Sequence, residues 1–190
     1  MENTEATFRN IHQDLIDGCR SGDQKAQFQI YKLYYKAMYN TSLRIVSDTM
    51  EAEDIMQEAF LSAFEKIDTY SGTVSFGAWL KRIVINRSLD ALKKNKAVFE
   101  DIDAHPGLRD DSNEDIKYQE EIELKVEEVK QAIEKLADGY RIILSLYLIE
   151  GYDHDEIAEI LSINSSTSRS QLSRAKQKLI GELKKTCKTI

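Results

Sequence analysis

The sequence has little cysteine, proline or glycine, and it has no long apolar run. Cys19 and Cys187 lie near opposite ends without a CxxC pair, so neither a disulfide framework nor a zinc site is encoded. We therefore expect the protein to be located in a reducing cytoplasm. No run approaches the roughly 18 apolar residues of a membrane helix, and the acidic start lacks the parts of a signal peptide, so we expect neither membrane insertion nor secretion. One proline and eight glycines in 190 residues favour long helices over turn-rich β architecture.

Charges of opposite sign are separated along the chain, although the net charge of −7 is by itself unfavourable for a nucleic-acid partner. Residues 80–98 hold six basic side chains and one acidic one, and residues 169–188 hold seven and one. Between them, residues 100–128 hold twelve acids and three bases. A single basic run is usually the solvated face of a helix. Two such runs, each at the end of an apolar-periodic segment, favour two anion-binding surfaces.

The N-terminal half shows three apolar stripes with helical spacing. The first helix is expected at about residues 23–45 and the third at about residues 76–92. The second helix should begin after an N-cap at Ser47-Asp48. The stripe of the second helix consists of Ile55, Met56, Ala59, Phe60, Ala63, Phe64 and Ile67. Three such helices can bury one another's stripes, which predicts a helical domain over residues 23–96. Residues 1–22 are expected to form an amphipathic helical leader that either extends this domain or waits for a partner.

Helical periodicity stops in the middle of the chain and then resumes. Residues 97–122 are polar and acidic and contain the only Pro-Gly pair, so we expect a linker there. Residues 123–190 return to helical spacing, with Gly151 as a helix stop and with Asp153 and Glu156 at capping-box spacing. The fold is therefore predicted to be all-α, with two small helical domains joined by an acidic linker.

The end of the chain has the order of a helix-turn-helix: a short helix, a turn at residues 162–164 and a basic last helix. An α-helix fits the major groove of B-DNA, and side chains on its first turns reach base edges. Leu172, Ala175 and Leu179 mark the buried side of the last helix. The opposite side should contact bases through Arg169, Ser170, Ser173 and Arg174 and phosphates through Lys176 and Lys178. The alternative, an ordinary basic helical hairpin, is disfavoured by the glycine stop, the capped short helix and the turn together.

Two groups of residues resemble conserved regions of bacterial sigma factors of the extracytoplasmic-function (ECF) group. Those that resemble region 4 include Tyr140-Arg141, Glu150-Gly151-Tyr152, Glu156-Ile157-Ala158, Thr167 and Ser173-Arg174-Ala175. Those that resemble region 2 are the run from Ala52 to Phe60 and the set Phe76, Trp79, Leu80, Asn86 and Asp90. The similarity covers roughly residues 23–96 and 123–185 and implies a σ2 domain, a linker without a σ3 domain, and a σ4 domain. It also implies promoter-specific transcription initiation with core RNA polymerase, through −35 duplex DNA and the melted −10 strand.

The resemblance implies three functional surfaces. A face of the second helix would dock on core polymerase through Asp54, Gln57, Glu58 and Leu61. The loop at residues 68–75 and the third helix would hold the −10 strand through Tyr70, Arg82, Asn86, Arg87, Lys93 and Lys94. Thr167 and Gln171 would join the recognition helix residues that contact the −35 element. From the residues alone, the second-helix face is more often a solvated surface, and Tyr70 is as much a core-edge aromatic as a base contact.

The second half departs from the resembled pattern at three positions. Ser162 replaces a frequent glycine in the turn, Ser168 replaces a valine under the recognition helix, and Gln171 replaces a frequent arginine. We expect Ser168 to loosen the helix packing slightly. Gln171 could read adenine rather than guanine.

Other classes of function remain as alternatives. His12, His105 and His154 occur singly and are explained as exposed histidines, so we expect no enzyme, no metal and no cofactor. An autonomous helix-turn-helix regulator would not need the face at residues 52–60. A further alternative is a helical interaction module that is held by a protein partner. It overlaps with the sigma factor hypothesis, because similar sigma factors are commonly held by anti-sigma factors between σ2 and σ4. The expected partners are core RNA polymerase, promoter DNA and an anti-sigma factor, and the acidic linker should enter polymerase channels as a phosphate mimic.

Overall fold

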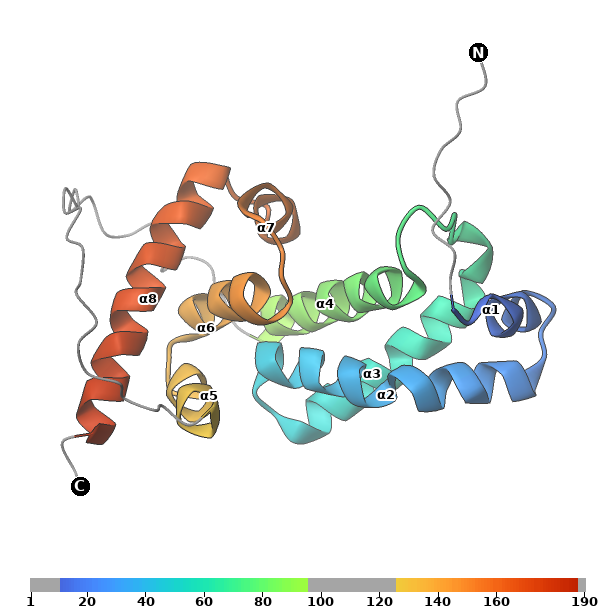
Figure 1. Ribbon diagram of the computed structural model, residues 1–190, viewed down its shortest axis with the longest axis horizontal. Coiled ribbons are helices and arrows are strands. Elements are labelled where there is room, and N and C mark those ends of the chain that lie inside the picture. The colour runs from blue at the N-terminus through green and yellow to red at the C-terminus, as the bar shows by residue number, and fades with distance from the viewer. Residues whose placement is uncertain (1–10, 96–125, 188–190) are drawn as a thin grey trace, which may run out of the picture. The chain divides into compact units, whose positions relative to one another are not determined.

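The regular structure of the described chain is helical throughout, as expected for an all-α protein (Figure 1). The computed structural model describes residues 11–95 and 126–187. The chain divides into two compact units, residues 1–95 and 96–190. The expected linker, residues 97–122, lies outside the described residues, so its role stays a prediction. No helix in the described part is long and apolar enough to cross a membrane.

The described part of the first unit consists of four α-helices and one short 3-10 turn. They are α1 (Gln13–Arg20), α2 (Gln24–Val46), α3 (Thr49–Glu65), η1 (Ile67–Thr69) and α4 (Phe76–Asn95). The carboxylate of Asp23 accepts the backbone N–H of Lys25, and that of Asp48 accepts the N–H of Glu51. These bonds satisfy donors that have no partner inside the helix, which is why α2 and α3 begin where they do. The three helices expected in this half are confirmed.

Apolar stripes from all four helices meet in one core. The rings of Phe76 and Tyr34 lie 5.6 Å apart at an angle of 62°, an edge-to-face contact favoured by the aromatic quadrupole. Ile16 is fully buried and Cys19 is 3% exposed in this same core. The helical part of the leader therefore extends the first domain and is not an arm waiting for a partner. Burial, reinforced by the nearby Asp23 carboxylate, raises the pKa of the Cys19 thiol.

The second unit is a smaller set of helices. Its described elements are α5 (Val126–Glu134), α6 (Asp138–Leu144), the π-helical turn η3 (Ser145–Ile149), α7 (His154–Leu161) and α8 (Ser165–Cys187). The expected glycine stop and capping box are both present. Gly151 has a φ of 80°, and the carboxylate of Asp153 accepts the backbone N–H groups of Asp155 and Glu156, while the Glu156 carboxylate accepts that of Asp153. Helix α7 then ends before Ser162, which has a left-handed φ of 57°, and α8 begins at Ser165.

The core of the second unit also contains a charge. Ile142, Leu146 and Ile157 are fully buried, and the guanidinium of Arg141, with its residue 4% exposed, lies 2.7 Å from the Asp138 carboxylate. A buried arginine is tolerated when it is paired in this way. The ion pair lies within α6, whereas buried apolar side chains pack α6 against α8, so that one side of α8 is left for solvent.

Asp153→Ala should lower the free energy of unfolding of the second unit by about 0.5–2 kcal/mol, because the first N–H groups of α7 lose their acceptor. Urea unfolding of the full chain, followed by circular dichroism, measures this change. Asp153→Asn keeps an oxygen acceptor at the same position and serves as the control, with a much smaller expected loss. An alanine variant as stable as the unmodified protein would contradict the capping role.

Candidate nucleic-acid interface

The first turns of α8 expose most of the side chains expected to contact duplex DNA. Arg169, Ser170, Ser173, Lys176 and Lys178 are exposed, and Thr167 and Arg174 are half-buried. Gln171 is the exception, because it is only 7% exposed. It lies four residues before Ala175 and next to Leu172, so it shares the buried side of the helix with them. The expected contact of Gln171 with adenine is therefore corrected: its side chain packs within the second unit.

Two side-chain hydrogen bonds hold the first turn of α8 against the first turn of α7. The hydroxyl of Ser168, which is fully buried, lies 2.9 Å from Nδ1 of His154. The hydroxyl of Ser165 donates to the carboxylate of Asp155. The bond to His154 gives the Ser168 hydroxyl a partner, and this offsets the cost of burying a polar group. His154 is half-buried, so the expectation of an exposed histidine is corrected here.

Aromatic contacts extend this junction. The rings of His154 and Tyr147 are stacked with centroids 5.1 Å apart, and Nζ of Lys176 lies 5.4 Å from the Tyr147 centroid. A cation over a ring face is attracted by the negative face of the ring. Lys176 is thus oriented by η3, a contact that helical periodicity alone could not reveal.

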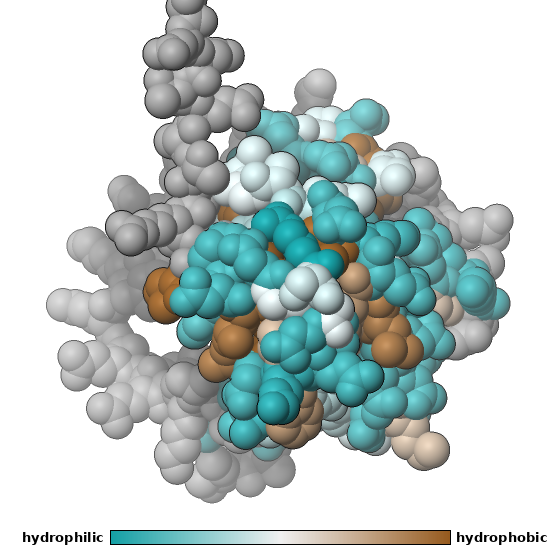
Figure 2. Space-filling view, turned by 90° about the vertical axis from the view of Figure 1, so that its right-hand side faces the viewer, coloured by the Kyte–Doolittle hydropathy of each residue, from teal (hydrophilic) through white to brown (hydrophobic). Residues whose placement is uncertain are grey.

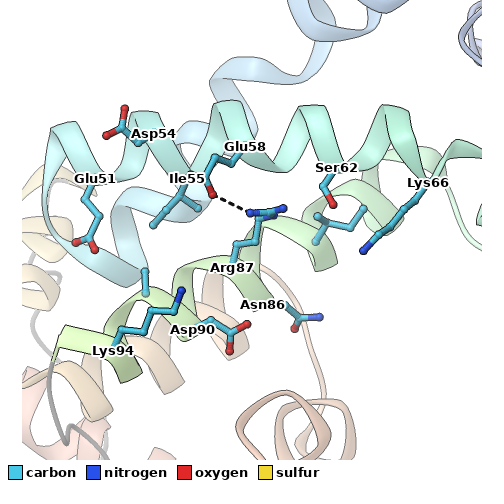
Figure 3. A pocket seen from close by; sticks show the side chains of 12 residues that line it. Glu51, Asp54, Ile55, Glu58, Ser62, Lys66, Asn86, Arg87, Asp90 and Lys94 are labelled. Carbon is cyan, nitrogen blue, oxygen red and sulfur yellow. Dashed lines mark hydrogen bonds and ion pairs between the residues drawn. The ribbon is translucent and has the colours of Figure 1, made fainter. Parts of the chain in front are cut away.

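A groove between α3 and α4 joins two sets of residues that the sequence assigned to different partners (Figure 3). Asp54 and Glu58 line it from α3, and Asn86, Arg87 and Lys94 line it from α4. Nη1 of Arg87 lies 2.8 Å from Oε2 of Glu58, so an ion pair spans the groove. These two side chains are 37% and 65% exposed, and an ion pair this accessible to water contributes little to stability. The ion pair is therefore not a major structural contact, and the groove is a candidate functional site.

The remaining basic residues of α4 continue this polar surface. Arg82 is half-buried and lies four residues before Asn86, which is exposed, so the two occupy one side of the helix. Lys93 is exposed in the last turn, next to Lys94. Positive side chains at this end are also favoured by the negative end of the helix dipole.

The face of α3 expected to dock on polymerase is exposed. Asp54, Gln57, Glu58 and Leu61 are all exposed, and Leu61 is 64% exposed despite being apolar. Gln57 and Leu61 line a second groove, between α2 and α3, which also includes Phe28. The exposed face of α3 thus separates a charged groove from an apolar one, a mixture suited to contact with a protein.

Tyr70, which the sequence offered as either a base contact or a core-edge aromatic, is buried. It is 3% exposed, its hydroxyl donates to the carbonyl of Val74 at 2.7 Å, and its ring packs on Phe76 and Trp79. Burial favours the second alternative, and Trp79 also lies against the core, as expected. Tyr70 shapes the loop from inside and does not present its ring to a ligand.

Comparison with known sequences and structures agrees with this arrangement. Residues 30–98 match the family profile described as Sigma-70 region 2, and residues 126–179 match the one described as Sigma-70, region 4. The ECF RNA polymerase sigma factor SigW of Bacillus subtilis is 31% identical over 177 residues, which cover 89% of this chain and 95% of SigW. The ECF RNA polymerase sigma-E factor of Escherichia coli K12 is 28% identical over 174 residues, 87% of this chain and 90% of that protein.

Solved structures show the same fold. The sigma factor RpoE in complex with the anti-sigma factor NepR, from Bartonella quintana, matches with a TM-score of 0.56 and 24% identity over 82% of this chain and 95% of that chain. CnrH in complex with the cytosolic domain of CnrY matches with a TM-score of 0.56 and 21% identity over 91% of this chain and 97% of that chain.

Regions 2 and 4 in this order define a sigma factor of the sigma-70 class. The similarity to SigW along nearly the whole of both chains narrows the class further, and the chain belongs to the ECF RNA polymerase sigma factors. It binds core RNA polymerase and promoter DNA and directs promoter-specific transcription initiation. The family is not one of enzymes, and the hypothesis of a lone helix-turn-helix regulator is set aside.

Arg87→Ala should change the free energy of unfolding of the first unit by less than about 1 kcal/mol, because its ion pair with Glu58 is open to water. Thermal unfolding at low and high salt measures the change. Leu80→Ala in the same helix removes a fully buried side chain and should cost about 2–5 kcal/mol. A loss at Arg87 as large as that at Leu80 would show that the ion pair is structural after all.

Proposed function

We propose that the two units read promoter DNA in two different forms. The second unit holds the intact −35 duplex with the exposed side of α8, and the first unit holds the melted −10 strand along α4 and the preceding loop. The observation that carries this proposal is the row of exposed polar and basic side chains on the first turns of α8, held there by the contacts of Ser165 and Ser168 with α7.

On α8, the side chains divide by chemistry. An arginine can donate two hydrogen bonds to O6 and N7 of guanine, so Arg169 and Arg174 are the proposed base readers, each contributing about 1–3 kcal/mol of discrimination. Thr167, Ser170 and Ser173 add shorter polar contacts. Lys176 and Lys178 lie further along the helix and neutralise phosphates, which fixes position without reading sequence.

In the first unit, the proposed −10 surface uses α4 and the loop between η1 and α4. Asn86 offers an amide to an unpaired base, and Arg82, Arg87, Lys93 and Lys94 neutralise phosphates, so that binding falls steeply with salt. With the Tyr70 ring buried, the loop contributes through its outer polar groups, Ser71 and Thr73, whose hydroxyls are 3.1 Å apart. Capture of a base that is free only after melting shifts the duplex towards the open state.

Core polymerase is proposed to bind the exposed face of α3, with Asp54 and Gln57 as polar anchors, Glu58 beside them and Leu61 as the apolar contact. The chain itself makes and breaks no bond in this scheme, because polymerase supplies the synthesis. The proposed site of action is the cytoplasm, where a bacterium keeps its chromosome.

We also propose that an anti-sigma factor holds this protein in its inactive state. One of the similar structures described above is a sigma factor in complex with an anti-sigma factor, and the other is CnrH in complex with the cytosolic domain of CnrY. The acidic linker is proposed to lie in polymerase channels that later carry nucleic acid. Shortening it without any change in initiation or early RNA release would contradict that role.

Asp54→Lys combined with Gln57→Ala should weaken binding to core polymerase at least tenfold, because the change replaces two polar anchors and reverses a charge. Retention of purified core polymerase on the immobilised full chain measures this binding. Glu65→Lys reverses an exposed charge near the other end of α3 and is the matched control, with no expected effect. If the double variant binds core as well as the control, α3 is not the docking face.

Arg174→Ala should weaken binding of the holoenzyme to a promoter that carries the −35 element recognised by this protein by about tenfold. It should also relax the base preference at one −35 position. Fluorescence anisotropy with matched and substituted −35 duplexes measures both effects. Lys184→Ala, near the other end of α8, is the control for a simple loss of positive charge. An equal loss on every DNA sequence would identify Arg174 as a phosphate contact.

A further inference from the structure

Helix α1 makes a polar contact with the loop that precedes α4. Nη2 of Arg20, in the last turn of α1, donates to the backbone carbonyl of Tyr70 at 2.8 Å, across fifty positions of sequence. Nη1 of the same guanidinium lies 3.0 Å from Oδ1 of Asp17, one turn earlier. One nitrogen of the guanidinium is thus turned to Asp17 and the other to the loop. The face shown in Figure 2 is largely hydrophilic, with separate apolar patches.

The position of α1 is itself closely defined by packing. A Cβ added to Gly18 would lie 2.6 Å from Cβ of Ala26 on α2, so the two helices approach at a distance that only glycine allows. Ile16 and Cys19 are buried in the core on the same helix. The turn after α1 is closed by a 2.9 Å hydrogen bond from the N–H of Asp23 to the carbonyl of Gly18. Arg20 therefore projects from a support that cannot shift without disturbing the core.

The loop is fixed at the same residue from two sides. Its inner side is held by the Tyr70 ring, which packs on Phe76 and Trp79 and whose hydroxyl reaches the carbonyl of Val74. Its outer side is held by the bond from Arg20 to the Tyr70 carbonyl. Ser71 and Thr73 follow directly, and both are exposed. The Tyr70 peptide is therefore the anchored end of the segment that carries these two hydroxyls.

We propose that Arg20 is a positioning residue for −10 recognition: through the Tyr70 carbonyl it presets the loop that receives the unpaired base, which makes α1 a functional part of the reading surface. This inference rests on the proposed role of the loop in −10 capture. A loop ordered before binding avoids the entropic cost of ordering it at the moment of capture, so the contact strengthens binding without touching DNA.

Full-length protein, reconstituted with purified core polymerase, is the system for the test. The probe is a fork DNA with a double-stranded −35 element and a single-stranded non-template −10 segment, taken from a promoter mapped by transcription with this holoenzyme. Arg20→Ala should weaken binding of this probe by about tenfold and reduce the preference for the correct −10 base. Binding of core polymerase and of the isolated −35 duplex should not change.

Three comparisons separate positioning from direct contact and from general destabilisation. Lys25→Ala removes an exposed positive charge near α1 and should have no effect. The slope of affinity against salt should stay the same in Arg20→Ala, whereas loss of a phosphate contact would lower it by about one. Arg20→Ala should add little to the loss caused by Ser71→Ala with Thr73→Ala, because all three act through one loop.

Gly18→Ala perturbs the same support independently. Its added methyl group should push α1 off α2, expose Cys19 and reproduce the loss of −10 binding. In a Cys187→Ser background, reaction of Cys19 with a thiol reagent reports this displacement. If Cys19 becomes reactive while −10 binding is unchanged, α1 has no positioning role.

The outcomes distinguish the inference from the function on which it rests. If the Ser71 and Thr73 double variant binds the fork DNA normally, the proposed role of the loop in −10 capture is wrong. If that variant is impaired and Arg20→Ala is not, the loop reads DNA without help from α1, and the inference is overturned. A reduced salt slope in Arg20→Ala would also overturn it, by identifying Arg20 as a phosphate contact.

Discussion

Burial of the apolar stripes of α1 to α4 against one another is the constraint on which the first unit depends. Each helix can bury only one side, so satisfying the core determines which side of every helix remains for partners. When Met56 and Phe60 of α3 and Leu80 and Val84 of α4 enter the core, Glu58 and Arg87 are left facing each other across a groove. The proposed docking face and the proposed nucleic-acid face are thus neighbours because of packing.

Polar contacts between elements then define the positions of segments that apolar packing alone does not fix. In the second unit, the contacts of Ser165 and Ser168 with α7 determine the position of the first turns of α8, which carry the proposed base readers. In the first unit, the Arg20 contact is proposed to do the same for the loop before α4. Both sites use side chains from one element to orient another, and neither contact crosses between the units.

The helices, their caps and the two-part organisation could be predicted, because they depend on local spacing and on residues a few positions apart. Asp48, Gly151 and the pair Asp153 and Glu156 act within one turn of chain, so their roles can be inferred from sequence. Gln171 and Tyr70 could not be assigned in the same way. Each is polar and borders an exposed stretch, and only the surrounding side chains decide whether such a residue faces inward.

The sequence by itself determined the all-α class, the separation of the two basic segments and the sigma factor resemblance, since all three are properties of residue order. Only the tertiary structure decided that the leader helix belongs to the core, that Ser168 finds a partner in His154, and that Arg20 reaches a carbonyl fifty positions away. The physical reason is that periodicity describes which side of a helix is buried. It does not describe which distant atom lies opposite a particular side chain once the helices have packed.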